Sequence, residues 1–247
     1  MSETDFLLAV ENLTVSFDGF KAVNDLTFYV DEKDIRVIIG PNGAGKTTVL
    51  DLICGKTRAS EGSIKFRNRE LTRLNETEIV LAGIGRKFQT PSIYDELTVF
   101  ENLEISYPKG RSVFGALTFK RDRAVIERVE EIAEIIFLKD QLKQSAEYLS
   151  HGQKQWLEIG MLLIQDPDLL MLDEPVAGMS ISERAKTAEL LNRIIADRSV
   201  IVIEHDMKFV EDIARKVTVL HQGKILSEGT MAQVKSDPKV IEVYLGH

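Results

Sequence analysis

The chain has 247 residues, 44% of them hydrophobic and 28% charged, which is enough for one large packed α/β domain, with or without a small second lobe. Acidic residues outnumber basic ones by 39 to 31, and no stripe of Lys and Arg is present, so we expect no nucleic-acid partner. The single cysteine, Cys54, excludes internal disulfides and indicates a reducing compartment. No secretory signal and no run of 18 uncharged apolar residues is visible, so we predict neither secretion nor a membrane span.

The amino-terminal part of the chain alternates between apolar and polar residues and predicts short strands. Asp18-Gly19 is a hairpin turn signal between two of them. The run 35–39, apolar except for Arg36, predicts a buried strand, and a helix follows from residue 49 until Gly55. Asn75, with Glu78 three residues later, is a capping-box pattern that opens a short helix. The alternating segments are 7–10, 13–17, 26–30 and 63–66.

Between the buried strand and that helix lies a glycine-rich loop with the pattern G-x-x-x-x-G-K-[ST], in the strand–loop–helix context of a phosphate-binding loop. Its backbone N–H groups can surround an anion, and the positive end of the helix dipole adds to the attraction. We expect Lys46 to reach the β- and γ-phosphates of a nucleoside triphosphate and Thr47 to coordinate Mg²⁺. The predicted loop consists of Gly40, Pro41, Asn42, Gly43, Ala44, Gly45, Lys46, Thr47 and Thr48.

Residues 92–149 differ in character, because apolar side chains recur there at helical spacing and no strong strand pattern is present. This segment predicts a helical insert. Strands at 169–172 and 200–203 then alternate with helices, which implies a mostly parallel sheet. Gln222-Gly223 predicts a terminal hairpin, and Asp237-Pro238 begins a last short helix. The apolar face of the insert includes Val125, Val129, Ile132, Ala133, Ile136 and Phe137.

Two carboxylates, Asp173 and Glu174, end the buried strand 169–172. The carboxyl end of such a strand lies beside the phosphate loop in a parallel sheet. We expect Asp173 to hold Mg²⁺, directly or through a water molecule, and Glu174 to orient or deprotonate the attacking water. An acidic pair that merely opens a helix is the alternative, but it leaves the combination with a phosphate loop unexplained.

The segment Ser150-His151-Gly152-Gln153 marks the start of a helix. Ser150 and Gln153 match a capping box, and a plain helix cap is one interpretation. The other is a second anion site, because the Ser150 hydroxyl, the Gly152 N–H and the helix dipole converge on one point. This site lies in the helical insert, far along the chain from Lys46, so the phosphate that it binds can belong to another molecule.

Three further residues are ambiguous when each is taken alone. Gln89 lies where the α/β pattern gives way to helices, and a lone Gln at such a place is more often a plain surface residue. His205 follows the strand 200–204 directly and is either a structural histidine or a ligand of the γ-phosphate. Phe17 can stack on a base or pack in the core.

Taken in order, these motifs resemble the nucleotide-binding subunit of ABC transporters over nearly the whole chain. The resemblance implies an ATPase that uses ATP and Mg²⁺, in which Phe17 stacks on the base, Gln89 contacts Mg²⁺ and senses the γ-phosphate, and His205 acts as a switch. It also implies a head-to-tail dimer, either with itself or with a second ABC ATPase. In such a dimer each phosphate loop faces Ser150, Gly152 and Gln153 of the other subunit.

The same resemblance implies a location and partners. Two membrane permease subunits, and indirectly a substrate-binding protein, complete such a transporter. The chain is then cytoplasmic and peripheral on the inner face of the plasma membrane. Two residues depart from the family pattern: His151 replaces the usual Gly, and Ser180 stands where most relatives carry Asp.

Finer features resemble the branched-chain amino acid group of ABC importers and, within it, the ATP-binding subunit of urea importers. We therefore expect urea as the solute, with a branched-chain amino acid as the alternative and a soluble, non-transport ABC ATPase as a more distant possibility. The segments that carry the resemblance are 86–91, 97–103, 151–156, 177–179 and 240–245.

The expected fold class is an α/β P-loop NTPase with a RecA-like core, an amino-terminal antiparallel β subdomain and an inserted α-helical subdomain. We expect all of these in a single ABC ATPase domain, 1–247. The predicted boundaries are 1–35 plus 60–70 for the β subdomain, 36–59 plus 156–230 for the core, 90–155 for the helical subdomain and 231–247 for the last helix.

Overall fold

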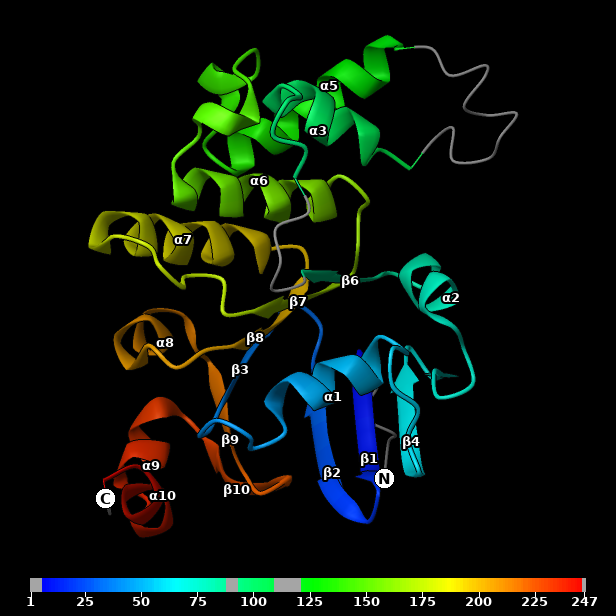
Figure 1. The fold of residues 1–247 in the computed structure, drawn as a ribbon, viewed down its shortest axis with the longest axis vertical. Coiled ribbons are helices and arrows are strands. Elements are labelled where there is room, and N and C mark those ends of the chain that lie inside the picture. Colours follow the sequence, from blue (N-terminus) through cyan, green and yellow to red (C-terminus); the bar gives the residue numbers. More distant parts are fainter. Residues whose placement is uncertain (1–5, 88–92, 109–120, 246–247) are drawn as a thin grey trace. The chain divides into compact units, whose positions relative to one another are not determined.

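The computed structural model describes residues 6–87, 93–108 and 121–245. The chain forms two compact units, whose elements are drawn in Figure 1. The first unit comprises 1–86, 168–175 and 194–247, and the second comprises 87–167 and 176–193. Each unit is described by itself.

An antiparallel sheet in the first unit has the strand order β2–β1–β4–β5. Phe17 pairs with Phe20 across Asp18 and Gly19, which confirms the predicted hairpin. Both turn residues have positive φ, 48° and 87°, as a two-residue turn between twisted strands requires. The predicted segments 7–10 and 13–17 form one strand with an irregular register near Asn12. The strands are β1 (Leu8–Phe17), β2 (Phe20–Val30), β4 (Glu61–Phe66) and β5 (Arg69–Glu70).

The second sheet of this unit is mixed and has the order β10–β9–β3–β8–β7–β6. Strands β9, β3, β8 and β7 run parallel, whereas β10 pairs antiparallel with β9 as the predicted terminal hairpin. The predicted fold class is therefore confirmed. The strands are β3 (Ile35–Ile39), β6 (Ile84–Lys87), β7 (Leu169–Asp173), β8 (Ser199–Ile203), β9 (Lys216–His221) and β10 (Lys224–Gly229).

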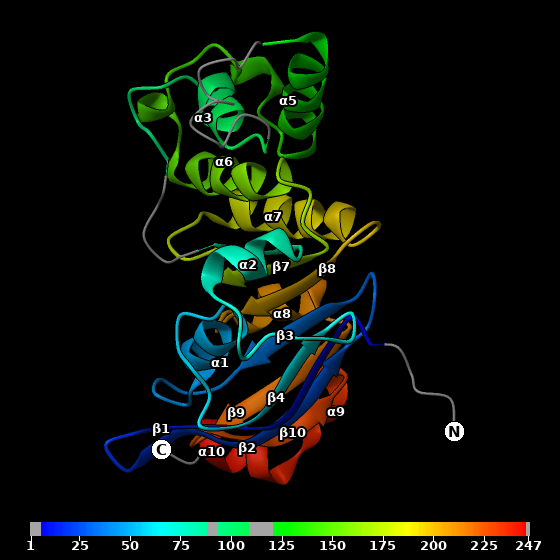
Figure 2. The same cartoon turned by 90° about the vertical axis from the view of Figure 1, so that its right-hand side faces the viewer.

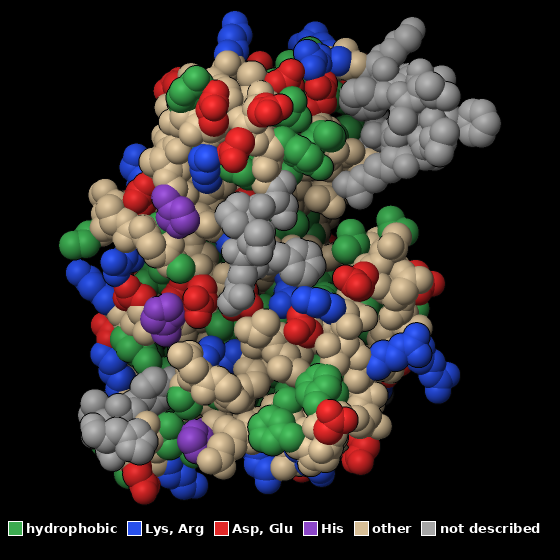
Figure 3. Space-filling view, viewed as in Figure 1, with side chains coloured by type: hydrophobic (Ala, Val, Ile, Leu, Met, Phe, Trp, Pro, Cys, Tyr) green, Lys and Arg blue, Asp and Glu red, His purple; other side chains and the backbone are tan. Residues whose placement is uncertain are grey.

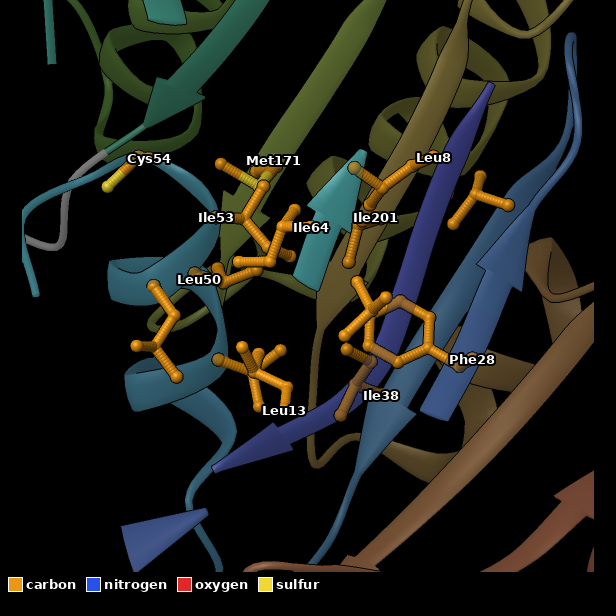
Figure 4. Close-up of a cluster of buried hydrophobic side chains, with 14 of the residues drawn as sticks. Leu8, Leu13, Phe28, Ile38, Leu50, Ile53, Cys54, Ile64, Met171 and Ile201 are labelled. Carbon is orange, nitrogen blue, oxygen red and sulfur yellow. The ribbon is translucent and has the colours of Figure 1, made fainter. Parts of the chain in front are cut away.

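The main core of the first unit surrounds α1 (Lys46–Ile53), which buries Val49, Leu50, Leu52 and Ile53. Side chains of both sheets meet this helix, as Figure 4 shows for Leu13 and Phe28 from one sheet and Met171 and Ile201 from the other. Burial of four side chains, each stabilising by about 1.5–3 kcal/mol, fixes the position of α1. The amino-terminal end of α1 is thereby held at a fixed place beside the mixed sheet.

Besides α1, four short helices lie within the described residues of the first unit. The capping box predicted at Asn75 and Glu78 opens α2. Two helices, α9 and α10, pack on the hairpin of β9 and β10 (Figure 2). The remaining helix, α8, follows β8. The bounds of these four helices are α2 (Glu76–Leu81), α8 (Met207–Ile213), α9 (Met231–Ser236) and α10 (Pro238–Leu245).

The second unit is helical, as the sequence predicts for the insert. The predicted apolar face of α5 is buried at Val125, Val129, Ile132 and Ala133. Helix α6 approaches this region closely, because a Cβ on Gly160 would lie 2.6 Å from Ile136 Cδ1. The helices are α3 (Val99–Ile105), α5 (Arg123–Ile135), α6 (His151–Leu163) and α7 (Ile181–Ile194), with 3₁₀ turns at Lys139–Gln141 and Ala146–Tyr148.

Helices α6 and α7 belong largely to this second unit. Trp156 on α6 is buried and donates through Nε1 to Thr187 Oγ1 on α7 at 2.9 Å. The sequence-based boundaries assigned residues 156–163 and 181–193 to the nucleotide-binding core instead. The structure divides the chain into two compact units and not into the predicted subdomains, so the subdomain boundaries stay a prediction.

Candidate nucleotide-binding site

Three parallel strands of the first unit end at the same edge of the mixed sheet. In the register of the sheet, Ile203 lies beside Ile38 of β3 and beside Asp173 of β7. The residues that follow these strand ends therefore come together at the carboxyl edge, and Glu174 N donates to Ile203 O at 2.9 Å. The phosphate loop, the two carboxylates and His205 all leave the sheet at this edge, as the sequence predicts.

The phosphate loop, 40–48, is closely packed against its surroundings. A Cβ on Gly40 would lie 2.3 Å from Leu220 O, and one on Gly45 would lie 2.5 Å from Ala22 O. Gly45 also has φ 100° and stands at the N-cap of α1, where no side chain caps the helix. The first N–H groups of α1 are therefore not satisfied by a cap, and they suit an anion.

Lys46 turns back over the loop that precedes it. Its Nζ donates to Gly40 O at 2.8 Å and to Pro41 O at 3.1 Å. Burial lowers the pKa of Lys46 from its usual range, and the charges of Glu174 and Asp173 act in the opposite direction. The ammonium group thus lies between the loop and two carboxylates, where it can neutralise phosphate oxygens.

Thr47 and Asp173 form the pair predicted to hold Mg²⁺. Thr47 Oγ1 donates to Asp173 Oδ2 at 3.2 Å. Asp173 is 2% exposed, and its Oδ1 has no hydrogen-bond partner among the described residues. Burial raises the pKa of Asp173, although the hydrogen bond from Thr47 and the charge of Arg86 oppose the shift. A buried carboxylate with one unsatisfied oxygen fits a cation ligand.

Glu174 and His205 lie together beside this pair. Glu174 has φ 48°, and His205 Nδ1 lies 3.4 Å from Glu174 Oε1. The neighbouring Glu204 is buried, and its Oε2 accepts from the backbone N–H groups of His205 and Asp206 at 2.9 and 3.3 Å. Glu204 therefore fixes the backbone that carries His205, a role that its position inside an apolar strand pattern did not reveal.

Phe17 stands at the end of the β1–β2 hairpin and is 48% exposed. Strand β2 of this hairpin runs beside the phosphate loop, because a Cβ on Gly45 would lie 2.5 Å from Ala22 O. An exposed aromatic ring near the loop is free to stack on a base. The alternative that Phe17 is a core residue does not agree with its exposure.

The second predicted anion site lies wholly in the second unit, at the start of α6. Ser150 and Gln153 form the predicted capping box, with Ser150 N donating to Gln153 Oε1 at 2.9 Å and Gln153 N donating to Ser150 Oγ at 3.2 Å. His151, which departs from the family pattern, lies with Nε2 2.9 Å from Ala177 O. Ser150 Oγ and Gly152 N also donate to Glu183 Oε1, at 2.8 and 3.2 Å.

Gln89 falls outside the described residues, so its predicted contact with Mg²⁺ stays a prediction. Two residues just before it make contacts that the sequence analysis missed. Arg86 Nη1 lies 2.6 Å from Asp51 Oδ1 and 3.0 Å from Cys54 Sγ. In the second unit, Lys87 Nζ lies 3.4 Å from Glu158 Oε2. The sequence predicted no buried strand at 84–87, so no local signal pointed to these two contacts.

These features define a P-loop ATPase of the cassette type. The family model for the ABC transporter matches residues 23–177, and the model for the branched-chain amino acid ATP-binding cassette transporter matches residues 224–247. The first match covers more than half of the chain. The chain belongs to the ABC transporter family, and it is an ATP-binding, ATP-hydrolysing subunit.

Curated relatives match the chain over almost its entire length. The high-affinity branched-chain amino acid transport ATP-binding protein LivG of Salmonella typhimurium is 35% identical, over 97% of this chain and 98% of the relative. BraF of Pseudomonas aeruginosa, named for the same transport, is also 35% identical with the same coverage. A probable LivG of Methanocaldococcus jannaschii is 33% identical over 100% of both chains.

Solved structures agree with this assignment. An ATP-binding cassette of an ABC transporter in its ADP conformation has a TM-score of 0.87 and 34% identity, covering 99% of this chain and 100% of that chain. A nucleotide-free cassette has a TM-score of 0.84 and 32% identity, covering 98% and 100%. The predicted ATPase activity and ATP cofactor are thereby confirmed for the family.

Two other expectations concern the transported solute and a membrane-spanning helix. Urea specificity receives no support, because the relatives described above are named for branched-chain amino acids. Of the helices in the described ranges, none has both the length and the apolar character that a membrane crossing needs. Acidic and basic side chains are interspersed on the face drawn in Figure 3.

Proposed function

We propose that this chain is the ATPase subunit of an ABC importer for branched-chain amino acids. The observation that carries the ATPase role is the grouping of Lys46, Thr47, Asp173, Glu174 and His205 at one sheet edge. The solute class rests on full-length relatives named for this transport and on the family match at residues 224–247. The earlier expectation of urea has no comparable support.

Mg²⁺ fits the residues at this edge. Among the described residues, no group of three or more His, Cys, Asp and Glu side chains could hold a metal alone. Thr47 and Asp173 would therefore share the ion with phosphate oxygens and water, as Mg²⁺ sites with nucleotides usually do. The orphaned Asp173 Oδ1 offers the required oxygen. When bound, the ion would neutralise charge that develops on the phosphates.

The remaining residues have separate roles in ATP binding and hydrolysis. The loop N–H groups and Lys46 bind the phosphates. Glu174 orients and deprotonates the attacking water, and His205, 3.4 Å from Glu174, holds that carboxylate and contacts the γ-phosphate. Phe17 stacks on the base, and Gln89 completes the metal contacts. Ser150, Gly152 and Gln153 act on the nucleotide of a facing subunit in a head-to-tail dimer.

The partners follow from this role. The facing subunit is a second ABC ATPase or another copy of this chain. Closure of the dimer around ATP and its reopening after hydrolysis would drive two membrane permease subunits, which hold this chain at the inner face of the membrane. A substrate-binding protein would deliver the solute, so solute specificity resides in those partners.

Uptake of labelled leucine and labelled urea tests the proposal. Cells whose only copy carries Glu174→Gln should lose leucine uptake and keep urea uptake. Glu147→Gln, an exposed carboxylate in another part of the chain, serves as the control and should keep both. Loss of urea uptake alone would return the assignment to a urea importer. Survival of both would reject the importer function for these solutes.

A further inference from the structure

Glu183, on the first turn of α7, joins two segments of the second unit. Its Oε2 accepts from Ser180 N at 2.9 Å and from Ser180 Oγ at 2.7 Å, and Glu183 N donates to Ser180 Oγ at 3.3 Å. This is a capping box, so Ser180 caps α7 in the place of the family's usual Asp. One carboxylate oxygen is therefore committed to the start of α7.

The other oxygen of the same carboxylate is bound to the start of α6. Glu183 Oε1 accepts from Ser150 Oγ at 2.8 Å and from Gly152 N at 3.2 Å. These two donors are the ones that the proposed function assigns to a phosphate of the facing subunit. Because a hydroxyl and a backbone N–H each have one proton to donate, both donors are already in use.

The contact is close and the carboxylate is charged. A Cβ on Gly152 would lie 2.5 Å from Glu183 Oε1, so glycine is what lets the oxygen approach the backbone. Hydrogen bonds from the backbone and side chain of Ser180, and then from Ser150, lower the pKa of Glu183 to about 2. At neutral pH the charged Glu183 carboxylate therefore occupies the position at which the amino-terminal end of α6 attracts anions.

We propose that Glu183 Oε1 is a built-in, displaceable occupant of the phosphate position at the start of α6. This inference rests on the proposed function, in which Ser150 and Gly152 bind a phosphate held by the facing subunit. A phosphate oxygen replaces Oε1 on both donors, since two anions at one pair of donors repel each other. Glu183 keeps its contacts with Ser180 through Oε2.

Two consequences follow for the ATPase cycle. ATP must compete with a resident carboxylate, so the dimer closes only at a higher ATP concentration than the two donors alone would require. The displacement also breaks the link between α6 and the start of α7. The loop 176–180, which His151 contacts at Ala177 O, is then held to α6 by fewer bonds when phosphate is bound.

The test is an ATP titration of ATPase activity, with the full-length chain purified together with its co-expressed partner subunits. Glu183→Ala removes the competitor and the cap. Glu183→Asp keeps a charged cap partner for Ser180 but is one methylene too short to hold Ser150 as well. Ser180→Ala weakens the cap alone. Ser150→Ala reports whether the start of α6 contacts nucleotide at all.

We expect Glu183→Ala and Glu183→Asp to lower the KM for ATP about tenfold, because hydrogen bonds to a charged group are among the stronger ones in proteins. Ser180→Ala should leave KM unchanged and lower only the melting temperature, which separates competition from capping. Ser150→Ala should raise KM. If Glu183→Ala does not fold, Glu183→Asp decides the question.

Two results would overturn the inference. An unchanged or raised KM in both Glu183 variants, with Ser150→Ala still raising KM, would mean that Glu183 only caps α7 or orients Ser150. In that case the head-to-tail dimer of the proposed function survives. If Ser150→Ala changes neither KM nor kcat, the start of α6 does not bind nucleotide, and the proposed dimer fails together with the inference.

Discussion

Arg86 on β6 and Asp51 on α1 are joined by a hydrogen bond of 2.6 Å between Arg86 Nη1 and Asp51 Oδ1. The same Nη1 lies 3.0 Å from Cys54 Sγ. The guanidinium group therefore connects the strand that leads toward Gln89 with the helix that begins at Lys46 and carries Thr47. Cys54 is buried, but its sulfur contacts a charged group, so it is not a purely apolar core residue.

Removal of this guanidinium should destabilise the first unit. Arg86→Met keeps most of the apolar stem and leaves the Asp51 carboxylate, whose side chain is only 19% exposed, without its main partner. We expect the free energy of unfolding to fall by about 2–3 kcal/mol. This is less than the loss expected for a wholly buried ion pair, because Asp51 keeps some contact with water. Urea denaturation of the purified chain measures it. Arg69→Met, on an exposed edge strand, is the control, and an equal loss in both variants would contradict the role of the pair.

The pair of Thr47 and Asp173 predicts that removal of the Thr47 hydroxyl impairs the use of Mg²⁺ in ATP hydrolysis. Thr47→Val preserves shape but removes the hydroxyl that lies 3.2 Å from Asp173 Oδ2. ATPase activity at saturating ATP should fall by about 10²-fold or more, because a ligand that stabilises transition-state charge is lost. Titration of activity with Mg²⁺ measures the effect. Thr47→Ser keeps the hydroxyl and should retain activity, and a Thr47→Val enzyme with normal Mg²⁺ dependence would exclude this site.

Glu183 predicts a pH dependence of stability with a defined sign. Its pKa is lowered to about 2 from 4.5, so folding gains the full contribution of its ionised form above pH 4.5. As the pH falls from 4.5 toward 2, the unfolded chain takes up the proton first and this contribution is lost. The stability difference between the native chain and Glu183→Gln should therefore shrink over that range. Denaturation between pH 7 and pH 3 measures it, with Glu242→Gln on α10 as the control. A pH-independent difference would contradict the assigned cause.

Local patterns in the sequence predicted much of the fold. The capping boxes at Asn75 and at Ser150 are present because both partners lie within four residues of each other, so local chemistry suffices to form them. The carboxyl edge that joins Gly40 and Asp173 was predictable because parallel strands align their ends. The apolar face of α5 was visible from helical spacing alone.

Contacts between distant residues were not predictable in the same way. Strand β6 was missed because Gly85, Arg86 and Lys87 break the apolar pattern, and the partner of Arg86 lies 35 residues away on α1. The bond between Glu183 and Ser150 spans 33 residues, and no local motif in the sequence indicates it. No spacing rule connects such pairs, because their meeting depends on how helices pack within each unit.

Phe17 provides a test of nucleotide recognition that leaves the chemistry of hydrolysis untouched. Phe17→Ala should raise the KM for ATP about tenfold with little change in kcat, because a stacked base contributes about 1–3 kcal/mol and the ring is far from the reacting phosphate in any stacked geometry. Steady-state kinetics measures the split, and tripolyphosphate, which has no base, should inhibit both enzymes equally. Phe20→Ala, across the same hairpin turn and 67% exposed, is the matched control. If Phe20→Ala raises KM as much as Phe17→Ala does, or if tripolyphosphate inhibition weakens as much as ATP binding, then the hairpin acts on the phosphate loop rather than on the base.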